Sequence, residues 1–125
     1  MTLPILRTGV DLVSVARLQH LLAVVGEPFS RKTWTAREIS DSAGRDESLA
    51  ARWAAKEATL KALRVGVDEI PMTDIEICLQ ESGAPELALS GLAAAAGRDA
   101  KLNSWSVSLS HESGLAIAFV IGLGA

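Results

Sequence analysis

Asp11, Glu57, Lys61 and His111 are the side chains of this 125-residue sequence whose types and surroundings could carry out chemistry. Asp11 lies in the middle of an apolar segment, where a carboxylate is costly unless it is paired or binds a cation. One interpretation is therefore a metal ligand. The alternative is an aspartate near the end of a strand that caps a helix beginning near Val15.

Glu57 and Lys61 lie one turn apart in the strongest helical pattern of the sequence, residues 49–64, which contains no glycine or proline. Each helical residue is rotated by about 100° from the previous one, so these two side chains are about 40° apart and flank the apolar stripe. They could serve a reaction, or they could form an ordinary ion pair between residues i and i+4. We expect Lys56 and Arg52 nearer the exposed side, where they could reach an anion or simply solvate the helix.

Asp11 and Glu57 together match the needs of a Mg²⁺ site. Mg²⁺ prefers a few carboxylate oxygens and completes its shell with water and substrate phosphate. Lys61 would then offset phosphate charge. The sequence contains neither the glycine-rich phosphate loop of nucleoside triphosphatases nor the dinucleotide-binding fingerprint.

His111 ends an alternating segment, residues 105–111, just before a turn. In a strand, Ser106, Ser108 and Ser110 would line the face opposite to the histidine. The histidine is either a plain surface residue or part of a site. Zinc is not expected, because the sequence has one cysteine and only one other histidine. A serine hydrolase is not expected either, because the nucleophile-elbow motif is absent.

The elements that must position these residues follow from hydrophobic periodicity and turn signals. Strands alternate with helices, and the class is α+β, with an antiparallel sheet packed against the long central helix. We place strands at residues 7–13, 105–111 and 116–121, a hairpin at 74–90, and helices at 15–25, 33–40, 49–64 and 91–98. Gly26 and Pro28 are expected to end the first helix, Thr35, with Glu38 three residues on, to cap the second, Ser48 to cap the long one, and residues 42–47 to form a loop.

The composition describes one globular domain, residues 1–125, with 49% apolar and 22% charged residues. A net charge of −3 argues against general nucleic-acid binding. A single cysteine allows no internal disulfide and suits the cytoplasm. The first residues lack a signal-peptide pattern. The apolar segment 115–125 is too short to cross a membrane as a helix and is typical of a buried strand.

Taken together, four segments resemble the holo-acyl-carrier-protein synthases, the small type of 4′-phosphopantetheinyl transferase. They are similar to the family's G-x-D strand, its signature helix (F/W)-A-x-K-E-A-x-x-K-A, its G-x-P turn and its S-x-S-H strand. In this sequence they are residues 9–13, 49–63, 83–85 and 108–111. The helix segment is the most specific. Residues 64–67 differ from the more usual Leu-Gly-Thr-Gly, and the first helix is less basic than in many relatives.

The resemblance implies roles for the residues that could do chemistry, on a 4′-phosphopantetheinyl transferase fold. Asp11 and Glu57 would bind Mg²⁺, and Lys61 would contact the pyrophosphate of coenzyme A and steady the leaving adenosine 3′,5′-bisphosphate. Glu57 and Lys61 would thus be catalytic. Glu112, beside His111, is a candidate base for the attacking serine, and a water on the metal is the alternative.

Other residues would bind the nucleotide of coenzyme A. Two basic side chains would lie near its 3′-phosphate, and the G-x-P turn would help to form the adenine pocket. The residues implied to bind coenzyme A are Arg52, Lys61, Gly66, Gly83, Ala84, Pro85, Ser110 and His111.

The implied reaction moves 4′-phosphopantetheine from coenzyme A to a serine of an apo acyl carrier protein, in fatty-acid or polyketide biosynthesis. Arg17 matches a position that meets the acidic helix of the carrier. The family is usually a homotrimer with its active sites between subunits. Two alternatives stay open: a non-catalytic module that binds coenzyme A or a carrier protein, and a Mg²⁺-dependent nucleotide phosphohydrolase. The sequence does not tell which carrier is served.

Overall fold

The computed structural model describes residues 3–125, so residues 1 and 2 of the expected single domain lie outside the described residues. The α+β class and the antiparallel sheet against a long helix are confirmed. The elements, in order, are β1 (Ile5–Ser14), α1 (Val15–Val24), α2 (Glu27–Thr33), α3 (Ala36–Ser42), α4 (Asp46–Leu63), the 3₁₀ turn η1 (Met72–Asp74), β2 (Ile75–Leu79), β3 (Pro85–Leu89), α5 (Gly91–Asp99), β4 (Leu102–Glu112) and β5 (Leu115–Gly124).

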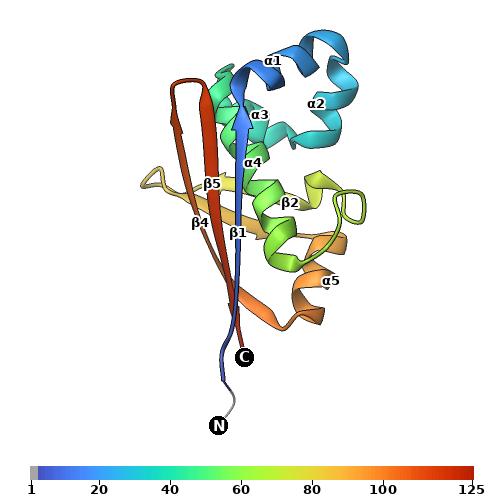
Figure 1. The fold of residues 1–125 in the computed structure, drawn as a ribbon, viewed down its shortest axis with the longest axis vertical. Helices are drawn as coiled ribbons and strands as arrows, with labels where there is room; N and C mark the ends of the chain where they lie inside the picture. Colours follow the sequence, from blue (N-terminus) through green and yellow to red (C-terminus); the bar gives the residue numbers. More distant parts are fainter. Residues whose placement is uncertain (1–2) are drawn as a thin grey trace.

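Three long strands form an antiparallel sheet in the order β1-β5-β4, and they lie side by side along one side of α4 (Figure 1). Asp11 of β1 pairs with Ala118 of β5, which pairs with Leu109 of β4. Because side chains alternate along a strand, these three residues share the face that packs on α4. The opposite face of the sheet carries Leu12, Ile117 and their neighbours at every second position.

Small residues let β1 and β5 approach the centre of α4. Ala54 and Ala58 of the helix and Ala118 of the strand are fully buried. The closest approach is at Gly9, where an added Cβ would lie 1.7 Å from the carbonyl oxygen of Ala58. Only glycine fits there, so the G-x-D pattern fixes how near β1 comes to the helix.

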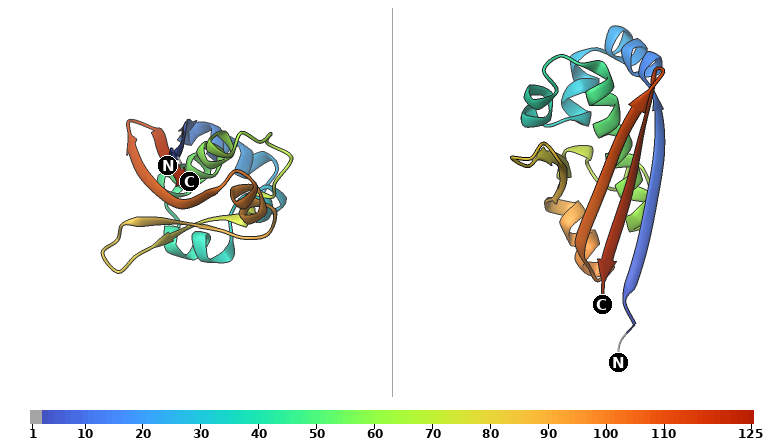
Figure 2. Two further views of the ribbon diagram at one scale, coloured as in Figure 1. Left: turned by 90° about the horizontal axis from the view of Figure 1, so that it is seen from below. Right: turned by 90° about the vertical axis from the view of Figure 1, so that its left-hand side faces the viewer.

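The other side of α4 is covered by the β2–β3 hairpin and by α3. Viewed along the strands, α4 lies between the three-stranded sheet and the hairpin (Figure 2). The helix therefore has no broad solvated face: of residues 49–60, only Glu57 is more than marginally exposed. This arrangement explains why an alanine-rich sequence without a clear polar stripe forms the central helix.

Several expected boundaries are wrong for local reasons. Gly26 ends α1 as expected, with φ of 76° and its N–H donating to the carbonyl oxygen of Leu21, but a further helix, α2, follows at once with Pro28 in its first turn, where the missing N–H costs nothing. Residues 42–47 are only partly a loop, because α3 includes Ser42 and α4 already begins at Asp46. Ser48 consequently lies inside α4 and does not cap it. The left-handed residue that ends α4 is Arg64, with φ of 60°, two positions before Gly66.

The predicted capping of α3 and the predicted C-terminal strand are confirmed. Thr35 and Glu38 form a reciprocal capping box at the start of α3. The apolar segment at 115–125 is the central strand β5, whose inward side chains are buried. In the described residues, no helix has both the length and the apolar content needed to cross a bilayer.

Candidate active site

Asp11, Glu57 and Lys61 meet where β1 crosses α4. Asp11 follows Gly9 by two residues and so points to the same face of the sheet, while Glu57 directly precedes Ala58, the residue that Gly9 touches. The Nζ atom of Lys61 lies 3.2 Å from Oδ1 of Asp11 and donates to the carbonyl oxygen of Val10 at 2.8 Å. The close approach at Gly9 thus places the predicted cluster.

The charge of Glu57 is disfavoured by its surroundings. Its partial burial raises the pKa of the Glu57 carboxyl, and the nearby carboxylate of Asp11 raises it further. Lys61 and Arg17 oppose this shift with their positive charges. A carboxyl whose pKa is raised by burial and by a neighbouring carboxylate marks a candidate functional site.

Two of the open alternatives can now be decided. The cap of α1 is Ser14, whose side chain accepts a hydrogen bond from the Arg17 backbone N–H, so Asp11 does not cap that helix. The ion pair of Lys61 in the described residues is with Asp11 of β1, and it is not an i to i+4 pair with Glu57. Both carboxylates therefore belong to one tertiary cluster.

The donor set fits a magnesium ion completed by water and substrate oxygens. Two carboxylates converge from rigid elements, which is the number of protein ligands that Mg²⁺ commonly takes beside a phosphate. No group of three or more His, Cys, Asp or Glu side chains that could hold a metal occurs within residues 3–125.

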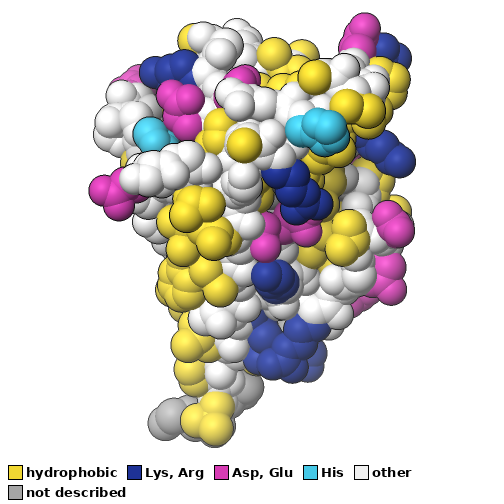
Figure 3. Space-filling model, turned by 45° about the horizontal axis from the view of Figure 1, so that its top comes forward, with side chains coloured by type: hydrophobic (Ala, Val, Ile, Leu, Met, Phe, Trp, Pro, Cys, Tyr) yellow, Lys and Arg dark blue, Asp and Glu magenta, His cyan; other side chains and the backbone are white. Residues whose placement is uncertain are grey.

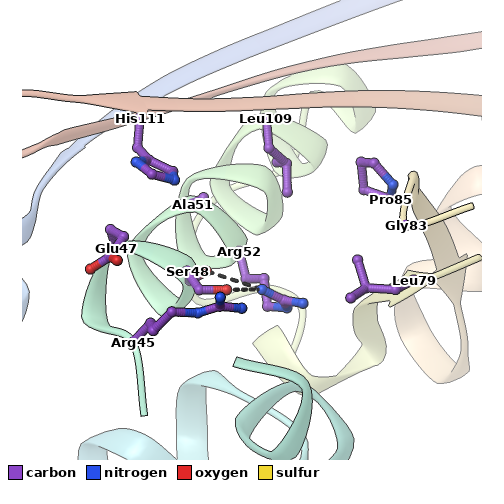
Figure 4. A pocket seen from close by; sticks show the side chains of 10 residues that line it. All are labelled: Arg45, Glu47, Ser48, Ala51, Arg52, Leu79, Gly83, Pro85, Leu109 and His111. Carbon is purple, nitrogen blue, oxygen red and sulfur yellow. Dashed lines mark hydrogen bonds between the residues drawn. The ribbon is translucent and has the colours of Figure 1, made fainter. Parts of the chain in front are cut away.

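A pocket of about 440 Å³ opens on the other side of α4, between that helix, β4 and the hairpin. Figure 4 shows His111 and Leu109 reaching down from β4 toward arginine side chains at the start of α4, with the hairpin closing the end. Four residues predicted from the sequence to bind the nucleotide line it together. They are Arg52, Gly83, Pro85 and His111.

Arg52 is the buried cation of this pocket, with 3% of its surface exposed. Its Nη1 atom donates to the backbone oxygen and the hydroxyl of Ser48, whereas its Nε–H has no partner in the described residues. Burial lowers the pKa of Arg52, and the carboxylates of Glu38 and Asp41 oppose this shift. An unpaired donor on a desolvated guanidinium calls for an anionic ligand, because a buried polar group without a partner is costly.

The expectation that Lys56 and Arg52 lie toward solvent is wrong. Lys56 is fully buried and its Nζ atom lies 2.7 Å from Oε1 of Glu38, which is also fully buried. The same amine donates to the carbonyl oxygens of Met72, at 2.9 Å, and Ile75. Burial lowers the pKa of Lys56, and Glu38 opposes this shift. The helix is enclosed on both sides, so a helical wheel could not find a solvated face.

The other predicted residues lie outside the pocket. Gly66 follows α4, and its N–H donates to Glu69 at 2.6 Å. Ala84 is at the exposed tip of the hairpin. Ser110 and Glu112 alternate with His111 and so point to the outer face of the sheet.

Sequence reasoning missed six pocket residues: Arg45, Glu47, Ser48, Ala51, Leu79 and Leu109. Arg45 could have been found: it stands seven residues, nearly two full turns, before Arg52 and so points to the same side of the helix. Because residues 42–47 were predicted to form a loop, helical spacing was not applied to Arg45. The hairpin contributes Leu79 through tertiary folding, which no local pattern reveals.

The cluster and the pocket are on different sides of one chain. Arg52 precedes Glu57 by five residues, which places the two side chains about 140° apart around α4. Asp11 is on the edge strand β1, and His111 is on the opposite edge strand β4. None of the three cluster residues lines the pocket. A single chain therefore presents two half-sites.

Comparisons with known proteins point to one family. A family model described as the 4′-phosphopantetheinyl transferase superfamily matches residues 7–120. The chain is 41% identical over 124 residues to a holo-[acyl-carrier-protein] synthase of Herpetosiphon aurantiacus, covering 94% of this chain and 98% of that one.

Solved structures give the same result. The Helicobacter pylori holo-[acyl-carrier-protein] synthase in complex with coenzyme A has a TM-score of 0.83 and 33% identity, covering 92% of this chain and 98% of that chain. An acyl-carrier-protein synthase–coenzyme A complex from Chronobacterium ammoniagenes has a TM-score of 0.86 and 27% identity, covering 97% and 98%.

Proposed function

Because the chain belongs to the 4′-phosphopantetheinyl transferase superfamily, we propose that it transfers 4′-phosphopantetheine from coenzyme A to a serine of an apo acyl carrier protein. The second product is adenosine 3′,5′-bisphosphate. It is an enzyme of the kind named holo-[acyl-carrier-protein] synthase, to which its relatives belong. The observation that carries the proposal is the Asp11–Glu57–Lys61 cluster, held at one point by the Gly9 contact.

The cluster suits the chemistry of the β-phosphate of coenzyme A. The serine oxygen forms a bond to this phosphorus while the bond to the leaving bisphosphate breaks, and negative charge grows on the phosphoryl oxygens. Asp11 and Glu57 would hold Mg²⁺, which when bound offsets that charge. The side chain of Lys61 is more than half exposed, so a substrate oxygen could approach its amine. The positive charge of the amine would then stabilise the negative charge on the leaving group.

The pocket suits the nucleotide end of coenzyme A. The unpaired Nε–H of Arg52, together with Arg45 and His111, provides donors and positive charge for a 3′-phosphate. Gly83 and Pro85 at the hairpin end of the pocket would contact the adenine. Solved relatives carry coenzyme A in their complexes, which supports this assignment.

We further propose that the two half-sites join between copies of the chain, in a homotrimer. The outer face of the sheet is apolar and uncovered along β1 and β5, with Leu12 and Phe119 57% and 44% exposed. Its exposed apolar side chains form one continuous surface along β1 and β5: Leu6, Val10, Leu12, Leu115, Ile117, Phe119 and Leu123. Hydrophobic side chains extend along the left side of the molecule in Figure 3. Such a surface marks an interface.

The serine must lose its proton, and Glu112 remains our candidate base. In one chain it lies on the outer face, opposite to Asp11. It would therefore act in a site to which a neighbouring copy contributes. Carrier identity, fatty-acid or polyketide, depends on the surface around Arg17, which is exposed on α1.

The function is tested by incubating the protein with apo carrier protein, coenzyme A and Mg²⁺, followed by mass spectrometry of the carrier. We expect the mass of phosphopantetheine on the carrier and a requirement for the metal. If no carrier of either class is modified, the transferase proposal fails. Release of adenosine 3′,5′-bisphosphate without a modified carrier would indicate a phosphohydrolase instead.

The assembly is tested by light scattering of the wild type and of Phe119→Asp. We expect a trimer for the wild type and a smaller species for the variant, because a charge in an apolar interface is costly. Ser104→Asp, on the polar strand of the same face, is the matched control. A monomeric wild type, with and without coenzyme A, would refute the trimer.

A further inference from the structure

We propose that Trp53 is a positioning residue, whose indole holds the guanidinium of Arg17 beside the Asp11–Glu57–Lys61 cluster for contact with the carrier protein. The inference rests on the proposed function, in which Arg17 faces an acidic partner. It adds a residue that acts through Arg17 and that does not itself touch the carrier.

The contact itself joins a buried ring to an exposed cation. Cζ of Arg17 lies over the Trp53 ring, 5.4 Å from its centroid. Trp53 is 7% exposed, whereas Arg17 is exposed on α1. Arg17 makes no ion pair within residues 3–125. The ring is therefore the main partner that restricts its guanidinium, and indole is the aromatic system that attracts a cation most strongly.

The ring is itself fixed by two aromatic neighbours. Trp53 makes edge-on contacts with Phe29, at 5.3 Å between centroids, and with Trp34, at 6.5 Å. Phe29 and Trp34 also touch each other edge-on at 5.4 Å. The Nε1–H of Trp34 donates to the backbone oxygen of Leu49 at 3.0 Å. An aromatic group thus joins α2 and the residue that follows it to α4.

The position of Trp53 links the cation to the reaction site. Glu57 follows Trp53 by one turn on the same side of α4. The Trp53 ring over which Arg17 lies is therefore next to Glu57 along the helix surface. Figure 3 shows acidic side chains lying between basic ones on this face of the molecule. Trp53 therefore sets where the carrier-facing cation stands relative to the metal-binding carboxylates.

A double-mutant cycle tests whether Trp53 acts through Arg17. KM for the carrier and for coenzyme A is measured for Trp53→Phe, Arg17→Gln and the double variant. Trp53→Phe should raise KM for the carrier about two- to five-fold, the factor that an exposed cation–π contact allows. It should add nothing once Arg17 is replaced, and KM for coenzyme A should stay unchanged.

Trp34→Phe is the matched control, because Trp34 belongs to the same aromatic group but is not the ring over which Arg17 lies. It should lower stability, through the lost bond to Leu49, and leave KM for the carrier at the wild-type value. Equal effects of Trp53→Phe with and without Arg17, or a matching rise in KM for coenzyme A, would overturn the proposal in favour of a purely structural role.

A readout without turnover separates this inference from the proposed function. In a ¹H–¹⁵N spectrum, Arg17→Gln should shift the indole N–H signal of Trp53 and leave those of Trp34 and Trp105 in place. The signal is assigned by its absence in Trp53→Phe. An unmoved Trp53 signal would overturn the contact, whether or not the protein modifies a carrier.

Discussion

At the scale of single residues, the surroundings of Glu57 disfavour its ionised form. Its pKa is raised first by burial and second by Asp11. A carboxyl whose pKa is raised in the folded state stabilises the fold below its unfolded pKa, and this contribution is lost as pH rises through the folded pKa. In the metal-free protein, the ionised Glu57 is thus unfavourable at neutral pH. Such a loss of stability is expected in the metal-free protein if the carboxylate serves to bind a cation.

Asp11→Asn should lower the pKa of Glu57 in the metal-free protein, because it removes the repelling charge. The pKa should stay above the usual glutamate range, since burial remains. The measurement is a titration of the Glu57 carboxyl carbon by NMR. A pKa that does not fall in Asp11→Asn would show that the two carboxylates are not one site.

Glu57→Gln should abolish most turnover, by about 100-fold or more, because it removes a ligand near the developing charge. The fold should persist, since the two side chains are nearly isosteric, and the metal-free variant should melt no lower than the wild type at pH 7. The transfer assay and thermal unfolding check these two outcomes. Glu81→Gln, on the exposed hairpin turn, is the control. Near-wild-type turnover of Glu57→Gln would refute the ligand role.

Lys61→Ala should raise the activation barrier by about 2–4 kcal/mol, as the loss of one preorganised stabilising group does. Its side chain is 56% exposed, so the free energy of unfolding should change little. Single-turnover kinetics with saturating coenzyme A would measure the barrier. An unchanged rate would exclude contact between Lys61 and the reacting phosphate.

At the scale of elements, the buried pair of Lys56 and Glu38 joins α4 to α3 and β2. Besides receiving Lys56, Glu38 accepts the backbone N–H of Ile77 at 3.0 Å and that of Thr35 at 2.9 Å. The pair thus ties the hairpin that closes the nucleotide pocket to the helix that carries Glu57. Lys56, which directly precedes Glu57, therefore holds three elements of the fold together.

Lys56→Met should destabilise the fold by about 3–5 kcal/mol, because it leaves the carboxylate of Glu38 buried without its partner. Urea unfolding measures the loss. The double variant Lys56→Met, Glu38→Gln should recover part of it, since no uncompensated charge remains. A loss within 1 kcal/mol for the single variant would mean that the pair is not buried as the structure has it.

Local patterns predicted most elements. Strand alternation, the α3 capping box and the alanine-rich helix each depend only on residues that are close together in the sequence. They failed where tertiary contacts decide. Pro28 lies in the first turn of α2, which packs against α1. Lys56 is buried because the hairpin covers a side of α4 that was expected to face solvent. Asp11 and Glu57 could be paired from the sequence only through the family motif, since the contact at Gly9 that joins them spans two distant elements.

At the scale of the whole molecule, one chain holds two half-sites and an uncovered apolar sheet face. The carboxylates stand at the β1 edge of the sheet and the nucleotide pocket at its β4 edge. Joining copies through the sheet would cover the exposed leucine, isoleucine and phenylalanine side chains and bring one chain's pocket toward the next chain's carboxylates. The proposed trimer would supply what a single chain leaves incomplete.

Complementation between inactive subunits tests this account most directly. Glu57→Gln and Arg52→Ala are co-expressed with different affinity tags, and oligomers containing both are isolated and assayed for carrier modification. Each variant alone should be nearly inactive, and the mixed oligomers should regain activity, because one interface unites an intact Glu57 with an intact Arg52. Mixed oligomers as inactive as either parent would contradict a site shared between copies of the chain.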